Sequence, residues 1–255
     1  MRRKLTTLLI SIPFAAMAAG ITGLQTAEAK CDTSSRGNDF EHHYWDGWKH
    51  NAVPNVTDGA YAKIWNYSPW VFNVPNNFSA AWVMLTNDHP YGTDAGYAQV
   101  GYLEFAGGWA QHHTFVQEHN YGETPKRTIL YAPQPASTYT YYTILYDEFW
   151  NRFTYQVAGS SLNEVWSPTN WIPHEAQASG ETLSKADQMP GGYLTAGDYV
   201  DLFDSEYYTS GAWHYFNPGA QTFIADQAGT DESALFGQKV WNSRDISIWD
   251  KKCQH

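Results

Sequence analysis

The chain has 255 residues, 16% of them aromatic, and a formal net charge of −11 at neutral pH. With only 15 lysines and arginines, it is a poor partner for nucleic acid and for anionic membranes, because both are bound by clustered basic side chains. Its length is sufficient for a sizeable core and is ordinary for a single β-sandwich or barrel.

The N-terminus has the pattern of an export signal. Three basic residues at positions 2–4 precede an apolar run over residues 5–24, and Ala27 and Ala29 supply the small side chains that a signal peptidase inspects. We therefore expect residues 1–29 to form a cleaved signal peptide, the mature chain to begin at Lys30, and the protein to be secreted or extracellular. An uncleaved membrane anchor is the alternative, and no later stretch is apolar enough to span a bilayer.

The chain holds two cysteines, Cys31 and Cys253, which lie close to the two ends of the expected mature chain. Export places both in a compartment that permits disulfides. We expect them to form one disulfide that joins the termini, with two unrelated free thiols as the alternative. Because no linker or repeat divides the sequence, residues 30–255 are predicted to form a single domain.

Aromatic residues occur in short runs with Thr, Val and Ile, a composition that favours β-strands, and helix-period stripes are short. Turn-forming residues separate the runs at intervals typical of a sandwich. The sequence therefore predicts an all-β fold, a single antiparallel β-sandwich. Strands are expected over residues 61–66, 70–74, 80–86, 97–105, 112–119, 138–146, 149–157, 199–203, 213–216, 222–225 and 246–249.

Two stretches lack a strand pattern. Glycines and prolines interrupt residues 120–136 and residues 166–192, so both are expected to be long irregular connections. Such connections beside a sheet often carry function, and one of them is expected to form a cleft wall. The aromatic segment over residues 42–48 is expected only to pack its rings.

The sequence lacks the Gly-x-Ser-x-Gly, His-Glu-x-x-His, phosphate-loop and dinucleotide-binding motifs. Neighbouring His112 and His113 point to opposite faces of a regular strand and cannot both ligate one metal. Zinc held by some of the histidines and calcium held by Asn87, Asp88 and Asp94 are the alternatives, although the EF-hand spacing is missing. We therefore expect no metal and no cofactor.

Carboxylates are the main candidates for chemistry. Those inside or beside predicted strands are Glu104, Glu118, Glu148, Glu164, Glu175 and Glu181. Two carboxylates that face each other across a concave sheet can act as acid and base, because repulsion and burial separate their pKa values. For each of them, a solvated glutamate on a strand face is the alternative.

Three short patterns stand together in the middle of the chain. Residues 82–85 are Trp-Val-Met-Leu, residues 97–101 are Tyr-Ala-Gln-Val-Gly, and Gly-Glu-Thr at 180–182 is followed by Gln-Met-Pro-Gly-Gly at 188–192. They resemble the Trp-Val-x-Ile strand, the glutamine strand and the glutamate segment of the eqolisin-type glutamic peptidases and, more distantly, the neprosin group. This resemblance spans about residues 80–192 and implies a concanavalin-like jelly-roll sandwich.

The resemblance also implies a catalytic dyad of Gln99 and Glu181. Glu181 would be the general base that takes a proton from water, and Gln99 would hold the water and stabilise the oxyanion through its amide. The residues expected to line the substrate site are Trp82, Tyr102 and Glu118. The alternatives for the acid are Glu118, in a strand that resembles the family's Tyr-Glu strand, and Glu175.

The expected function is a secreted hydrolase, an acid-acting glutamic endopeptidase that works as a monomer on an extracellular polypeptide. The main alternative comes from the aromatic-rich residues 139–155, where alternate rings point to opposite faces and outward rings could stack on sugars. The protein would then bind or cleave glycans, using Glu104 or Glu118 with Glu181, unless the rings form only the core between the sheets. A non-catalytic extracellular binding protein is the third possibility.

Overall fold

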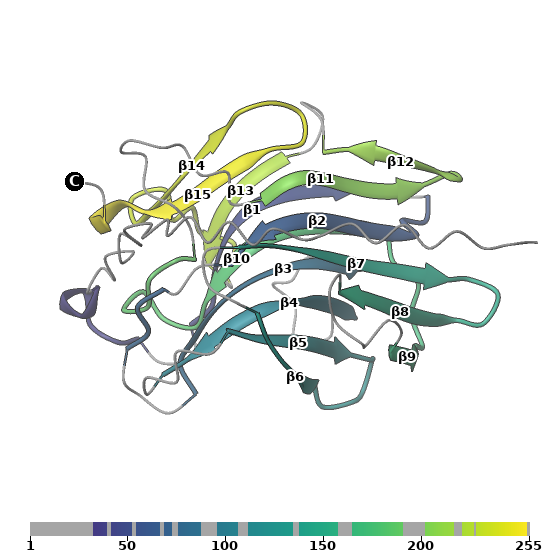
Figure 1. The fold of residues 1–255 in the computed structure, drawn as a ribbon, viewed down its shortest axis with the longest axis horizontal. Coiled ribbons are helices and arrows are strands. Elements are labelled where there is room, and N and C mark those ends of the chain that lie inside the picture. Colours follow the sequence, from purple (N-terminus) through teal and green to yellow (C-terminus); the bar gives the residue numbers. More distant parts are fainter. Residues whose placement is uncertain are drawn as a thin grey trace, which may run out of the picture.

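The computed structural model describes residues 33–39, 42–52, 55–66, 69–72, 76–87, 96–106, 112–134, 138–157, 165–190, 202–216, 221–226 and 228–253. Almost all of the regular structure is β-strand, and the strands form two antiparallel sheets that pack face to face (Figure 1). The all-β sandwich predicted from the sequence is thus confirmed.

The first sheet, sheet A, has seven strands in the order β13-β1-β10-β3-β4-β5-β6. Their bounds are β1 (Tyr44–Asn51), β3 (Phe78–Thr86), β4 (Tyr97–Phe105), β5 (His112–His119), β6 (Lys126–Gln134), β10 (Glu175–Thr182) and β13 (Gln221–Asp226).

The second sheet, sheet B, has eight strands in the order β14-β15-β11-β2-β7-β8-β9, and β12 (Ala212–Tyr215) pairs with β11. The other bounds are β2 (Gly59–Trp65), β7 (Tyr139–Asp147), β8 (Arg152–Val157), β9 (Val165–Pro168), β11 (Leu202–Thr209), β14 (Phe236–Val240) and β15 (Ile246–Asp250). Two short 3-10 helices, η1 (Ser34–Arg36) and η2 (Lys251–Cys253), lie near the ends of the described chain.

Strands that are far apart in the sequence lie side by side in sheet A. β10 lies between β1 and β3, so that Glu181 is opposite Trp45 on one side and opposite Ala80 on the other. β4 follows β3, with Gln99 opposite Met84. This order places the strand of Glu181 two positions from the strand of Gln99.

The aromatic-rich β7 and β8 divide their rings between the two faces of sheet B. Tyr142 and Tyr155 belong to the buried cluster between the sheets, and both are almost completely inaccessible. Tyr139 and Tyr141 occupy the alternate positions and point outward, because successive strand residues face opposite sides. The segment therefore supplies both the core and part of an outer surface.

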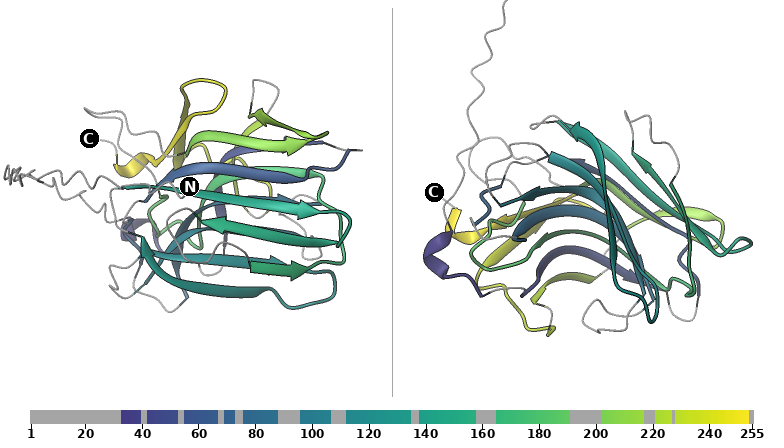
Figure 2. Two further views of the ribbon diagram at one scale, coloured as in Figure 1. Left: turned by 45° about the vertical axis from the view of Figure 1, so that its right-hand side comes forward. Right: turned by 90° about the horizontal axis from the view of Figure 1, so that it is seen from below.

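The outer face of sheet A is concave and carries a second apolar cluster that includes Trp82, Leu103 and Phe115. The guanidinium of Arg127 on β6 lies 4.7 Å from the ring centre of Phe78 on β3. In a flat sheet the Cα atoms of these two residues would be roughly 24 Å apart, given the usual strand spacing and rise. The sheet must therefore bend strongly, and Figure 2 shows this curvature along its strands.

Two predicted connections contain strands instead. Residues 126–134 form β6, an edge strand of sheet A, where a proline is tolerated because one side of the strand needs no backbone donors. Residues 175–182 form β10, and the prolines at 173 and 190 flank this strand without interrupting it. Irregular structure was expected over 120–136 and 166–192, and this was wrong for the central part of each segment, which forms a strand.

Three smaller expectations also change. The segment 42–48, to which only ring packing was assigned, contains the start of β1, a strand paired on both sides. Residues 69–72 form no strand, and the rest of the segment 70–74 lies outside the described residues. The strand expected over 149–157 begins at Arg152, because a turn occupies residues 148–151.

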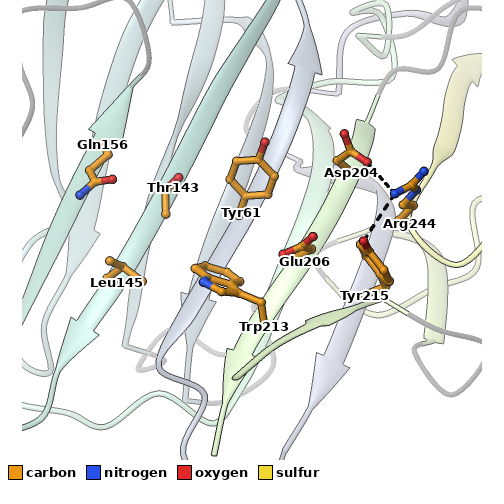
Figure 3. Close-up of a pocket in the computed structure, with 9 residues that line it drawn as sticks. All are labelled: Tyr61, Thr143, Leu145, Gln156, Asp204, Glu206, Trp213, Tyr215 and Arg244. Atoms are coloured by element: carbon orange, nitrogen blue, oxygen red, sulfur yellow. Dashed lines mark hydrogen bonds and ion pairs between the residues drawn. The ribbon is translucent and has the colours of Figure 1, made fainter. Parts of the chain in front are cut away.

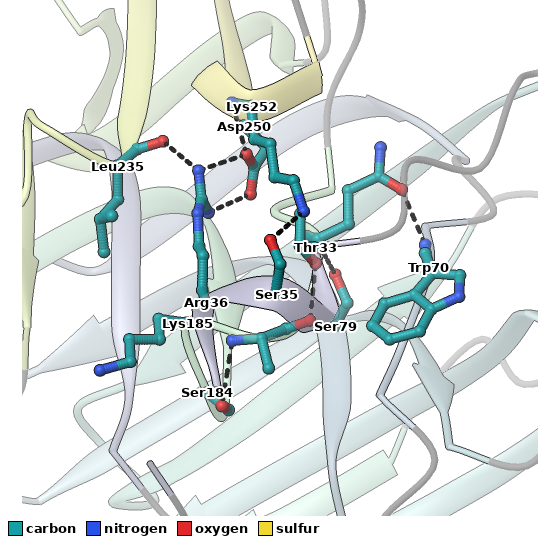
Figure 4. A network of polar contacts seen from close by, with 12 residues as sticks. Thr33, Ser35, Arg36, Trp70, Ser79, Ser184, Lys185, Leu235, Asp250 and Lys252 are labelled. Atoms are coloured by element: carbon teal, nitrogen blue, oxygen red, sulfur yellow. Dashed lines mark hydrogen bonds and ion pairs between the residues drawn. The ribbon is translucent and has the colours of Figure 1, made fainter. Parts of the chain in front are cut away.

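The two ends of the described chain lie against each other (Figure 4). Arg36 in η1 makes two hydrogen bonds of 2.7 Å to the carboxylate of Asp250, and Lys252 donates to Ser35 Oγ at 2.6 Å. Residues 1–29, the predicted signal peptide, and Cys31 lie outside the described residues, so the disulfide with Cys253 stays a prediction. Within the described ranges, no helix has the length and hydropathy needed to cross a membrane.

Candidate functional site

The concave face of sheet A carries a row of side chains that crosses five neighbouring strands, and four of these strands contribute a polar residue. Gln99 of β4, Gln117 of β5 and Arg127 of β6 lie in one row across the sheet, and the row continues through Met84 of β3 to Gln177 of β10. Residues in one row of an antiparallel sheet point to the same side. All of these side chains therefore face the concave space.

Gln99 is almost completely buried, with 5% of its surface exposed. Within the described part of the chain, no hydrogen bond to its amide group is found. Its oxygen and nitrogen are not among the fully buried polar atoms that lack a partner in the described residues, so the amide keeps some access to solvent in the concave space. Such a group is suited to bind a ligand that enters the concave space.

Glu181 is equally buried, and two side chains hold its carboxylate. The indole nitrogen of Trp82 donates a hydrogen bond of 2.7 Å to Oε2, and His43 Nδ1 lies 2.6 Å from Oε1. His43 stacks on Trp45, with ring centres 5.6 Å apart. The carboxylate is thus fixed from both sides, while each oxygen keeps one lone pair for a further partner.

The local sequence explains how Trp82 reaches this position. Trp82 lies opposite Gly101 on β4 and Ser179 on β10, two small residues. A Cβ atom at position 101 would lie 2.7 Å from both the Cα and the Cβ of Trp82. The glycine two residues after Gln99 therefore gives the indole the room it needs beside Glu181.

Gln99 and Glu181 share the concave face but do not lie in the same row. They are two strands and four residues apart, which corresponds to roughly 16 Å between their Cα atoms in a flat sheet. The curvature of the sheet brings the side-chain ends closer. Burial and the negative charge of Glu181 both raise the pKa of Tyr97, a neighbour of Gln99 on β4, although a hydrogen bond from Gln117 lowers it. The carboxylate therefore faces the same space as the side chains around Gln99.

Glu175, the alternative acid, also lies on the concave face and is buried. Its Oε1 accepts a hydrogen bond of 2.5 Å from the Gln177 amide nitrogen, while Gln177 Oε1 is buried without a partner among the described residues. Glu175 lies in the row of Tyr97, two residues from the row of Gln99. The structure thus places two carboxylates of β10 on either side of the Gln99 row.

Glu118 and Tyr102 lie on the opposite face. Glu118 accepts hydrogen bonds from Tyr155 Oη at 2.6 Å and from Ser167 Oγ, both in sheet B. Tyr102 is completely buried in the core between the sheets. Both residues therefore tie the sheets together and do not face Gln99 in this structure.

Sequence reasoning did not identify three polar residues of this face: His43, Gln177 and Arg127. His43 lies just before β1, which was not predicted, and 138 positions separate it from Glu181. Gln177 and Arg127 lie in the two strands that were taken for irregular connections. The aromatic and histidine-rich pattern of residues 42–48 was the only signal that could have directed attention to His43.

Two solved structures resemble this arrangement of strands. Scytalido-glutamic peptidase, solved with a peptide-based transition state analog, covers 84% of this chain and 98% of its own, with a TM-score of 0.52 and 10% identity. SCP-B, a member of the Eqolisin family solved with the tripeptide Ala-Ile-His, covers 84% and 99%, with a TM-score of 0.50 and 11% identity. This chain has the fold of the glutamic peptidases.

The resemblance inferred from three short segments is therefore confirmed at the level of the fold. No protein-family model and no curated protein sequence matches the chain. At 10–11% identity the likeness to the glutamic-peptidase fold does not carry an activity with it. The chemistry must be argued from the side chains of the concave face.

Proposed function

We propose that this chain is a secreted, acid-acting glutamic endopeptidase in which Gln99 and Glu181 activate water. One observation carries the proposal: a largely buried amide with no hydrogen-bond partner among the described residues and a carboxylate held at both oxygens face one concave space in a glutamic-peptidase fold. Both side chains stand on the same face of a curved sheet, so a water molecule and a substrate carbonyl would lie above the sheet between their ends.

The reaction would follow from these two groups. Glu181 takes a proton from water, and the water oxygen attacks the carbonyl carbon of a peptide bond. The Gln99 amide donates a hydrogen bond to the oxyanion of the tetrahedral intermediate and stabilises it without a charge of its own. Protonated Glu181 then gives its proton to the nitrogen of the leaving amine, and the C–N bond breaks.

Trp82 and His43 would act as positioning residues for the carboxylate. The indole N–H of Trp82 donates a hydrogen bond to one carboxylate oxygen and so fixes the orientation of the Glu181 carboxylate. His43 is partly exposed and lies 2.6 Å from the other oxygen, so it restricts the rotation of the carboxylate from the opposite side.

Degradation of an unstructured protein between pH 3 and 8 tests this proposal. Gln99→Ala should lower kcat/KM by about 10²–10³-fold, the usual effect of removing an oxyanion donor. Glu181→Gln should remove activity by a similar or larger factor. Glu148→Gln, the same chemical change at an exposed turn, serves as the matched control and should leave the rate unchanged.

Glu175→Gln completes the experiment, because it distinguishes the two carboxylates of β10. Cleavage that survives Glu181→Gln but not Glu175→Gln would move the role of base to Glu175. Absence of cleavage at every pH, or cleavage indifferent to Gln99→Ala in a folded protein, would overturn the proposal and favour a non-catalytic binding protein.

A further inference from the structure

The outer face of sheet B, opposite to the proposed catalytic face, carries a long groove. One part of it encloses about 650 Å³ and is bordered by β2, β7, β8, β11, β12 and the loop that precedes β15 (Figure 3). An adjoining part encloses about 540 Å³. The two parts share Leu145, Gln156 and Trp213, so they form one continuous depression, called the outer groove here.

Aromatic rings line the outer groove and remain open to solvent. Trp213 and Tyr215 on β12 line it and are 40% and 43% exposed, and Tyr141 on β7, which lies beside the lining, is 42% exposed. Tyr61 on β2 stands between them, with its ring centre 6.2 Å from that of Trp213 and 6.3 Å from that of Tyr141. Exposed aromatic side chains gathered in this way indicate a binding surface, because water solvates their faces poorly.

Carboxylates lie beside these rings at the end of the groove near Tyr215. Asp204 and Glu206 of β11 both line it, and Arg244 bridges Asp204 at 3.3 Å and Tyr215 Oη at 3.4 Å (Figure 3). Burial and the neighbouring charge of Asp204 raise the pKa of Glu206. The two acids and the amide of Gln156 offer hydrogen bonds at several points along the aromatic surface.

A strained backbone directs Asp204 into the groove. The pairing of β11 with β2 has a bulge between Phe203 and Glu206, and Asp204 has a φ of 50°, a rare value for a residue with a side chain. Its N–H donates to Asp245 Oδ1 at 3.0 Å, and the N–H of Ser205 donates to the Arg244 carbonyl at 2.8 Å. Strain that several contacts maintain is typical of functional sites.

The charge and backbone of the groove restrict its occupant. Its lining residues include four acids, Asp58, Asp147, Asp204 and Glu206, and one cation, Arg244, which is paired with Asp204. Beside the lining, Arg152 is paired with Asp147, and Lys63 lies over the ring of Tyr141. Because acids outnumber cations here, the surface disfavours anionic polymers. The strands β2, β7, β8 and β11 beneath the groove are each paired on both sides, so an added peptide strand would find few backbone partners there.

A chain of neutral sugars fits these features. The C–H faces of pyranose rings can stack on Trp213, Tyr61 and Tyr141, and their hydroxyl groups can donate to Asp204 and Glu206. We propose that the outer groove is a binding site for a neutral polysaccharide, separate from the proposed peptidase site. It would hold the protein on a glycan surface while the opposite sheet acts on polypeptide.

Affinity electrophoresis and calorimetric titration of the mature chain test this proposal. The probes are soluble hydroxyethyl cellulose, xylan and galactomannan, with polygalacturonate as the acidic counterpart. At least one neutral polymer should bind, and polygalacturonate should not. Trp213→Ala and Tyr61→Ala should each weaken binding at least tenfold, a loss of about 1.4 kcal/mol.

Tyr121→Ala is the matched control, because Tyr121 is also 42% exposed but lies outside the groove. The Tyr121→Ala and Gln99→Ala variants should each bind the polysaccharide with the affinity of the unchanged chain. If Trp213→Ala fails to fold, Gln156→Ala removes a polar contact from an exposed position and should weaken binding several-fold. Binding of none of the neutral polymers, binding indifferent to Trp213→Ala and Tyr61→Ala, or Trp213-dependent binding of a peptide alone would overturn the proposal.

Discussion

Asp187 should make the fold less stable as pH rises, whereas most carboxylates of folded proteins make it more stable. It is completely buried shortly after β10, and its Oδ1 accepts hydrogen bonds from the Phe72 N–H at 2.8 Å and from the Asn77 amide at 3.1 Å. Its Oδ2 is buried without a partner among the described residues. Burial raises the pKa of Asp187 to about 7, although these hydrogen bonds lower it.

The sign of the effect follows from proton linkage. A group whose pKa is higher in the folded than in the unfolded chain stabilises the fold at low pH, and this stability is lost as pH rises through the folded value. For Asp187 the loss runs from about pH 4 to about pH 7. The difference between 3.8 and about 7 corresponds to roughly 4 kcal/mol, because each unit of pKa is worth 1.36 kcal/mol.

Asp187→Asn removes the charge with almost no change of shape. The variant and the unchanged chain should have similar free energies of unfolding at pH 4. At pH 8 the variant should be more stable by up to roughly 4 kcal/mol. Urea unfolding followed by tryptophan fluorescence at intervals from pH 4 to 8 measures this difference.

Asp226→Asn is a control of opposite sign. Burial opposes ionisation of Asp226, but hydrogen bonds from His42, Thr230 and Ala228 outweigh it and lower its pKa. This variant should lose stability at neutral pH, and the loss should diminish in acid. A difference between Asp187→Asn and the unchanged chain that stays constant from pH 4 to 8 would refute the reasoning.

Three further changes test other contacts. Trp82→Phe keeps a ring but removes the hydrogen bond to Glu181, so the proposed peptidase activity should fall about tenfold or more, while the circular dichroism spectrum should stay close to that of the unchanged chain. Arg36→Met leaves Asp250 as an unpaired buried carboxylate and should cost about 3–5 kcal/mol, visible as a lower Tm. Gly101→Ala would place a Cβ atom 2.0 Å from the backbone oxygen opposite it on β3, so chemical denaturation should reveal a loss of about 1–3 kcal/mol.

Much of the fold could be predicted because alternation and composition agree with it. The strands predicted over 97–105 and 112–119 match β4 and β5 residue for residue. These segments combine aromatic and β-branched residues between turn-forming stretches, so local preference and tertiary context favour the same structure. The division of rings between the core and an outer face in β7 and β8 followed from the alternation of residues along a strand.

β10 could not be predicted because its local sequence does not favour a strand. Its residues, Glu-Ala-Gln-Ala-Ser-Gly-Glu-Thr, include few β-formers, yet all eight are buried. The strand is stabilised by pairing on both sides, with β1 and β3, and its small side chains fit between the bulky residues of those neighbours. Pairing between distant segments leaves no signal in a local window.

The candidate site was only partly accessible to sequence reasoning for the same reason. Gln99 and Glu181 were named through a resemblance, and the structure places both on one concave face. Glu118 and Tyr102 were named through the same resemblance, but their registers direct them to the core between the sheets. The His43 contact with Glu181 depends on the position of β1, which no local pattern revealed.

The insertion of β10 between β1 and β3 also determines the order in which the protein can mature. Tyr44 of β1 pairs with Thr182 of β10, so this contact has a very large sequence separation, and contacts of that kind form slowly. A chain that has emerged only as far as β9 has no β10 to place between β1 and β3, and its concave face is incomplete. The face that carries Glu181 can therefore form only after β10 has been synthesised.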